Sequence, residues 1–147
     1  VSRTYRQALD DYFEDPERYK KNIPYYKEEI AKCTYRQFTT GFFFGPTSHE
    51  SQIYDNNTYV KGYVYLGMIN RVNEDGTGVF EQKNKFSVGE TVEIMKPGGE
   101  NIRTKVLSMY DEDGNEIESC PHPEQQIQIK TECNLQPFDI IRKEGLE

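Results

Sequence analysis

The chain has 147 residues and a net charge of −7, and its mean hydropathy is −0.87. This length suits one domain with a small extension and excludes a (β/α)₈ barrel, which needs roughly 200 residues or more. The acidic balance argues against a domain that binds nucleic acid tightly on its own, and no stretch approaches the ~18 apolar residues of a membrane helix. Because 11 Tyr and 8 Phe can fill much of a small core, we expect a folded chain.

Residues 1–33 are predicted to be a helical lead-in. Helical spacing places one apolar stripe on its first part, formed by Tyr5, Ala8, Leu9, Tyr12 and Phe13. Asp15 and Pro16 are expected to end this helix and to start the next turn, and Pro24 is expected to open a second segment. The chain begins at Val1 inside the helical pattern, so we expect it to be part of a longer protein.

Residues 34–58 are predicted to form a junction strand followed by a polar loop. Phe42, Phe43 and Phe44 are consecutive, so a strand would carry phenyl rings on both of its faces. Burial of these rings between the helices and a sheet is the favoured interpretation. The alternative is an exposed surface that stacks on bases or docks a partner.

Residues 59–147 are predicted to be a β-domain that carries a net charge of −6. Turn signals occur at 73–76, 97–99 and 111–115, and Gly62 and Gly67 are expected bends or bulges. The expected strands are 59–72, 78–82, 91–96, 101–110, 125–131 and 138–142. About five to seven short strands without a helical pattern indicate a small barrel or sandwich.

The residue types of a catalytic or metal site are sparse. Cys120, His122 and Cys133 are fewer than the four ligands of a structural zinc site, and the acidic run 111–116 lacks the glycine position of an EF-hand. His49 and His122 have no glycine-flanked serine elbow near them. We therefore expect no catalysis, metal or cofactor in this stretch, and the odd cysteine count favours a reduced, cytoplasmic setting.

The densest basic group of the β-domain is Lys83, Asn84 and Lys85, to which Arg103 and Lys105 can add. These side chains could meet RNA phosphates at one rim. The alternative is an ordinary solvated strand end, which is what short charge runs usually are.

Four stretches together resemble the C-terminal part of the collagenase-like peptidase family U32. They are residues 35–45 (YRQFTTGFFFG), 80–94 (FEQKNKFSVGETVEI), 137–143 (PFDIIRK) and 5–10 (YRQALD). The family often has His-Arg where this chain has Tyr35-Arg36. The resemblance implies a mainly β fold, a small antiparallel β-barrel similar to the second domain of elongation factor Tu, preceded by a short helical segment.

The resemblance also implies a function. The family's larger N-terminal domain is TIM-barrel-like and in several members carries an iron–sulfur cluster, and relatives act in tRNA wobble-uridine hydroxylation. This chain is then expected to be a non-catalytic accessory domain that binds or positions substrate, with RNA favoured and a protein substrate as the alternative. Its expected partners are the preceding catalytic domain and tRNA or protein, and not a membrane. The candidate binding residues are Arg36, Phe42, Phe43, Phe44, Lys83, Asn84 and Lys85.

Overall fold

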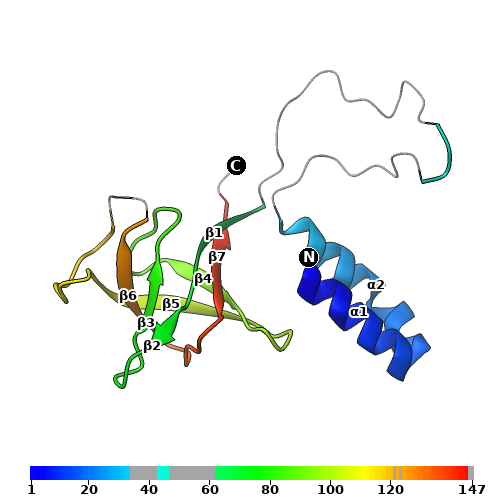
Figure 1. Ribbon diagram of the computed structural model, residues 1–147, viewed down its shortest axis with the longest axis horizontal. Helices are drawn as coiled ribbons and strands as arrows, with labels where there is room; N and C mark the ends of the chain where they lie inside the picture. Colours follow the sequence, from blue (N-terminus) through cyan, green and yellow to red (C-terminus); the bar gives the residue numbers. More distant parts are fainter. Residues whose placement is uncertain (34–42, 47–61, 121, 123, 146–147) are drawn as a thin grey trace.

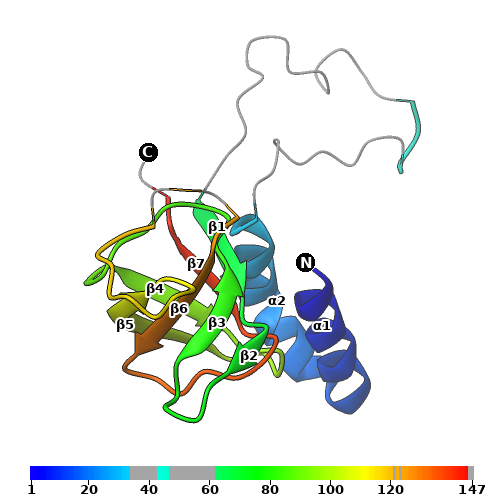
Figure 2. The same cartoon turned by 60° about the vertical axis from the view of Figure 1, so that its left-hand side comes forward.

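The computed structural model places two helices on one side of a curved antiparallel sheet (Figures 1 and 2). The helices are α1 (Ser2–Glu14) and α2 (Pro16–Ala31). The structure describes residues 1–33, 43–46, 62–120, 122 and 124–145. The junction predicted at 34–58 therefore lies outside the described residues except for 43–46.

The break between the helices is where the sequence predicts it. The side chain of Asp15 accepts a hydrogen bond from the backbone N–H of Glu17 at 3.0 Å, so it caps α2. Pro16 occupies the first turn, where its missing N–H costs nothing. This part of the prediction is confirmed.

The predicted second start at Pro24 is wrong, because α2 runs through that residue. An interior proline removes one hydrogen bond, here the one to the carbonyl of Lys20, and strains the turn before it. The helix continues because its other backbone hydrogen bonds remain and because the part after Pro24 is bonded to α1. There the Tyr26 hydroxyl donates a hydrogen bond to the carboxylate of Asp11 on α1.

The apolar stripe predicted on α1 exists, but the described part of the chain does not cover it. Tyr5, Leu9, Tyr12 and Phe13 are 60%, 52%, 51% and 80% exposed. The helical periodicity was therefore predicted correctly, whereas burial of this face within the chain is not observed.

Seven strands form the sheet in the order β1-β7-β4-β5-β6-β3-β2, and every pairing is antiparallel. They are β1 (Tyr63–Met68), β2 (Arg71–Val72), β3 (Gly78–Glu81), β4 (Thr91–Met95), β5 (Asn101–Tyr110), β6 (Gln126–Thr131) and β7 (Ile140–Glu144). The ladder does not close into a complete barrel. One backbone hydrogen bond, from the N–H of Lys83 to the carbonyl of Leu66 at 2.8 Å, joins β1 to the end of β3. The mainly β prediction is confirmed, with a looser barrel than a closed one.

The core lies inside the curve of the sheet. Phe80 and Phe86 are fully buried, and their rings stack at a centroid distance of 6.2 Å. The rest of the cluster is mostly aliphatic: Leu66, Ile69, Val92, Ile94, Val106, Met109, Ile127, Ile129, Leu135 and Ile141, with Cys120. Within the described residues, no member of this cluster comes from α1 or α2. The helices must therefore attach to the sheet by other means.

Candidate functional site

Charged side chains join the helices to the sheet. Arg3 of α1 donates hydrogen bonds to the carbonyl of Lys96 at 2.9 Å, to Oδ1 of Asn101 at 2.8 Å and to Oε2 of Glu29 at 3.0 Å. One guanidinium thus links α1, α2 and the connection between β4 and β5. The fork of five donors explains why arginine suits this position.

Glu29 continues this network into the sheet. It is 3% exposed and forms ion pairs with Lys32 and with Arg142, whose guanidinium lies 3.4 Å away. Burial is the largest single influence on the pKa of Glu29 and raises it, but the hydrogen bonds from Lys32 and Asn101 and the charges of Lys32 and Arg142 together outweigh burial, so the pKa lies below its ordinary value. Arg142 also packs over the ring of Tyr63 at 4.8 Å from its centroid. Lys32 and Arg142 also form ion pairs with Glu93 of β4, at 3.9 and 2.5 Å. We call Arg3, Glu29, Lys32, Glu93 and Arg142 the ionic joint.

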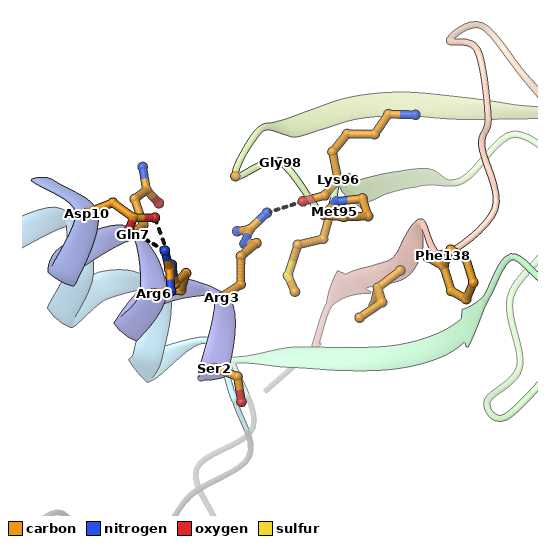
Figure 3. Close-up of a pocket in the computed structure, with 12 residues that line it drawn as sticks. Ser2, Arg3, Arg6, Gln7, Asp10, Met95, Lys96, Gly98 and Phe138 are labelled. Carbon is orange, nitrogen blue, oxygen red and sulfur yellow. Dashed lines mark hydrogen bonds and ion pairs between the residues drawn. The ribbon is translucent and has the colours of Figure 1, made fainter.

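A groove lies beside the ionic joint, between α1 and the turn that connects β4 to β5 (Figure 3). Its volume is about 650 Å³, within the range of ligand-binding clefts. Arg6 and Gln7 of α1 form one wall, and Gly98 of the turn faces them (Figure 3). The apolar side chains in the lining are Met95, Pro97, Phe138 and Ile140. We call this the α1 groove.

The backbone at Phe138 has an unusual conformation. Its φ is 72°, a left-handed value that is uncommon for a bulky residue. The N–H of Phe138 donates to the carbonyl of Ile69 at 2.8 Å, and the N–H of Ile69 donates to the carbonyl of Asp139 at 2.8 Å. These two bonds hold the strained backbone and leave the Phe138 ring 68% exposed at the groove.

Asp139 fixes the same connection from inside. It is fully buried, and its Oδ2 accepts hydrogen bonds from Nζ of Lys96 at 2.5 Å and from the N–H of Gln136 at 2.8 Å. The ammonium of Lys96 is therefore occupied inside the protein, although Lys96 lines the groove. The guanidinium of Arg3 is occupied in the same way. Arg6 differs, because within the described part of the chain its partner is Asp10 on the surface of α1, at side-chain exposures of 76% and 48%.

The structure separates the three residues of the predicted basic group by what they contact. Lys83 forms ion pairs with Glu81 and with Glu124, and the hydrogen bond to Glu81 is the main reason that its pKa is raised. The Asn84 side chain donates a hydrogen bond to the carbonyl of Tyr65 at 2.7 Å, which holds the loop after β3 against β1. Lys85 is exposed. Two acids thus offset much of the positive charge predicted here.

The other predicted residues lie in or beside the junction. Phe43 and Phe44 are 84% and 81% exposed and contact each other edge to face at 4.9 Å, so the burial predicted for them is not found. Arg36 and Phe42 lie outside the described residues. In the part of the chain that the structure describes, no hydrogen bond or ring contact joins Phe43 or Phe44 to the loop 83–85.

Sequence reasoning did not find the α1 groove. Residues 138–142 were expected to be a strand, whereas β7 begins at Ile140 and Phe138 precedes it in a left-handed turn. A phenylalanine before a strand gives no signal for that conformation. The expectation for α1 concerned its apolar stripe and not its arginines.

The described residues contain no group of three or more His, Cys, Asp or Glu placed to hold a metal ion. Iron–sulfur clusters are usually held by four cysteine thiolates, and the chain has only three cysteines, all of them free. No helix among the described residues has the length and apolar character needed to cross a membrane.

Comparison with known proteins gives three findings. Residues 61–142 match the sequence profile of the peptidase family U32 C-terminal domain. The chain is 32% identical over 144 residues to tRNA hydroxylation protein P1 of Bacillus subtilis (strain 168). That alignment covers 97% of this chain but 34% of the relative, so the chain spans about a third of the relative's length.

The third finding is structural. The crystal structure of the C-terminal domain of a Geobacillus thermoleovorans protein named as a U32 peptidase is 32% identical, with a TM-score of 0.50 over 55% of this chain and 92% of that one. Its selenomethionine variant gives 31% identity and a TM-score of 0.50, over 54% of this chain and 99% of that chain.

Proposed function

Since the chain belongs to peptidase family U32 through that family's C-terminal domain, we propose that it is a non-catalytic module that binds or positions an RNA substrate for a longer protein. One observation carries this proposal. The similarity to a tRNA hydroxylation protein extends over 97% of the chain, so it takes in the helices as well as the sheet. If this chain acts on the same class of substrate as that relative, the similarity of both the helices and the sheet is explained.

In this proposal, the catalytic residues of the longer protein lie outside this chain. The four thiolates of an iron–sulfur cluster exceed what this chain offers, so such a cluster would lie in the two thirds of the relative that this chain does not match. His122 is exposed, and the Cys120 thiol meets it at the backbone carbonyl, to which it donates a hydrogen bond at 3.4 Å, rather than at the imidazole. Three free thiols suit a reduced, cytoplasmic location.

The exposed stripe of α1 is the proposed contact with the preceding domain of the longer protein. Tyr5, Leu9, Tyr12 and Phe13 form a continuous apolar face that no described part of this chain covers. Soluble proteins rarely leave such faces uncovered. The ionic joint then transmits the position of that domain to the sheet through α2.

The RNA footprint of this chain is small. Lys83 is neutralised by Glu81 and Glu124, and the β-domain is acidic as a whole. Two or three phosphate contacts predict a slope of about −2 to −3 for the logarithm of affinity against the logarithm of salt concentration. High affinity would then depend on the preceding domain, which raises the local concentration of RNA.

A protein substrate is the second candidate, and it is favoured by one observation. Phe43 and Phe44 are adjacent, exposed rings, and aromatic anchors are typical of protein interfaces. Binding through such anchors depends weakly on salt. Salt dependence therefore discriminates between the two candidates.

The test is a titration of the 147-residue chain with total tRNA and, separately, with denatured gelatin, each at several salt concentrations. The double variant Lys83→Glu and Lys85→Glu is expected to weaken tRNA binding. Its matched control is Arg71→Glu with Lys130→Glu, which changes charge equally at the opposite end of β3. Salt-independent binding of gelatin without binding of tRNA would replace the RNA proposal with the protein one.

A further inference from the structure

We propose that the α1 groove holds a short unpaired RNA segment, with one base stacked on Phe138 and a phosphate facing Arg6. This inference rests on the RNA-binding function proposed above and assigns the place where the RNA lies. It uses residues outside the loop 83–85, so the two sites can be tested separately.

The first step is the position of Phe138. Its ring is 68% exposed and lines the groove, while its backbone is held in a left-handed conformation by bonds to and from Ile69 and by the buried Asp139. Burial of the ring does not explain this strained backbone, because the ring is mostly exposed. A fixed aromatic face is what base stacking requires, because stacking gains little from a ring that must first be ordered.

The second step is the floor of the groove. Met95 and Ile140 are half-buried and lie between α1 and Phe138, as Figure 3 shows for the labelled Met95. A methionine side chain adapts its shape to a planar group placed over it. The floor thus suits the apolar faces of a base and a sugar, while leaving their polar edges at the open side.

The third step is charge. Arg3, Arg6 and Lys96 line the groove with a single acid, Asp10. Arg3 and Lys96 are paired with the buried carboxylates of Glu29 and Asp139, which offset their charges. Arg6 is 76% exposed, and among the described residues its side chain is bonded to the exposed Asp10 alone, so a phosphate can take the place of that carboxylate. This exchangeable guanidinium beside an exposed aromatic ring favours RNA over an apolar peptide at this site.

The fourth step explains why the RNA must be unpaired. A base inside a duplex presents only its edge, whereas stacking on Phe138 needs an open face. In Figure 3 Arg6 and Phe138 lie at opposite ends of the groove with Met95 between them. The backbone of a short single strand can run from one end to the other.

The experiment uses the 147-residue chain and a single-stranded RNA octamer that contains one 2-aminopurine, with the same octamer in a duplex as a comparison. Wild-type protein should quench 2-aminopurine fluorescence in the single strand and leave the duplex unchanged. Phe138→Ala should weaken binding by about 5- to 160-fold, because stacking on an aromatic ring is worth about 1–3 kcal/mol per base. Phe138→Tyr should retain binding and quenching.

Two further variants complete the test. Arg6→Glu should weaken binding and make the salt slope shallower by about one. Phe13→Ala removes a phenyl ring of α1 that is 80% exposed and lies outside the groove lining, and RNA binding by the 147-residue chain should stay unchanged. If tRNA and the octamer bind and Phe138→Ala has no effect, the α1 groove is not the site and the proposed function stands. If neither RNA binds wild-type protein at low salt, the proposed function fails and this inference with it.

Discussion

Arg142 of β7 and Glu93 of β4 form a buried ion pair in which Nε lies 2.6 Å from Oε2. Their side chains are 9% and 8% exposed, and the two residues are directly paired across the sheet. The same guanidinium reaches Glu29 of α2. One guanidinium thus pairs with a carboxylate of the sheet and with a carboxylate of the helices, which makes the ionic joint a stability determinant.

The first prediction follows from this shared cation. Arg142→Met should lower the free energy of unfolding by about 3–5 kcal/mol, because it leaves Glu93 and Glu29 buried without it. Urea denaturation followed by circular dichroism measures the change. The matched control is Arg103→Met, which breaks an ion pair to Glu144 of equal length whose side chains are both 64% exposed, and which should leave stability nearly unchanged. Equal effects of the two substitutions would contradict the role given to burial.

The second prediction concerns pH. The pKa of Glu29 is held below its ordinary value of 4.5, so its ionised form stabilises the folded state. That contribution is fully present above pH 4.5 and is lost as the pH falls through the lowered value. Glu29→Gln should therefore be less stable than wild type at pH 7, and the difference should narrow below pH 4.5.

Urea midpoints for both proteins at pH 7, 4.5 and 3 measure this difference. Other acids with lowered pKa values, such as Asp75 and Asp111, are present in both proteins and cancel in the comparison. A stability difference that stays constant across this range would show that the charge of Glu29 does not contribute.

Local chemistry made the strand layout predictable. The turn at 73–76 closes where expected, with the N–H of Asn73 bonded to the carbonyl of Thr77 and Gly76 at a φ of 84°. The strand 101–110 has the expected bounds. Asp15 and Pro16 likewise mark a helix start by their own bonding properties. Each of these signals is contained within a few neighbouring residues.

The ionic joint and the α1 groove had no such local signal. Glu29 and Arg142 are 113 positions apart, and nothing near either residue identifies the other as its partner. The groove combines α1, the turn after Met95 and the residues before β7. Lys83 was predicted to belong to a basic group, but the fold places Glu124, which is distant in the sequence, beside it. Such sites depend on tertiary contacts, which periodicity and turn chemistry do not contain.

The third prediction concerns the close packing of β1 on β3. A Cβ added at Gly67 would overlap the ring of Phe80 and lie 2.8 Å from the carbonyl oxygen of Glu81. Phe80 is fully buried and the carbonyl belongs to a strand, so neither can move away easily. Gly67→Ala should cost about 1–3 kcal/mol, as overpacking typically does.

Thermal and urea unfolding measure this cost. Gly62→Ala is the matched control, because an added Cβ there meets no atom within 4 Å. The register of β1 against β7 shifts between Tyr65 and Gly67, so the substitution should also disturb amide exchange at this bulge. Unchanged stability of Gly67→Ala would mean that β1 can move away from Phe80.

The last prediction separates strain from packing at Phe138. Its φ of 72° is strained for any residue with a Cβ, at a cost of about 1–3 kcal/mol, and glycine adopts it freely. Phe138→Gly should therefore be more stable than Phe138→Ala by about 1 kcal/mol after the greater flexibility of unfolded glycine is counted. Urea denaturation of the two variants measures this difference. Because the ring is 68% exposed, neither variant loses much buried area, so stability should depend mainly on the backbone. A more stable alanine variant would show that the backbone at this position relaxes, and the ring would then lack the fixed support on which stacking depends.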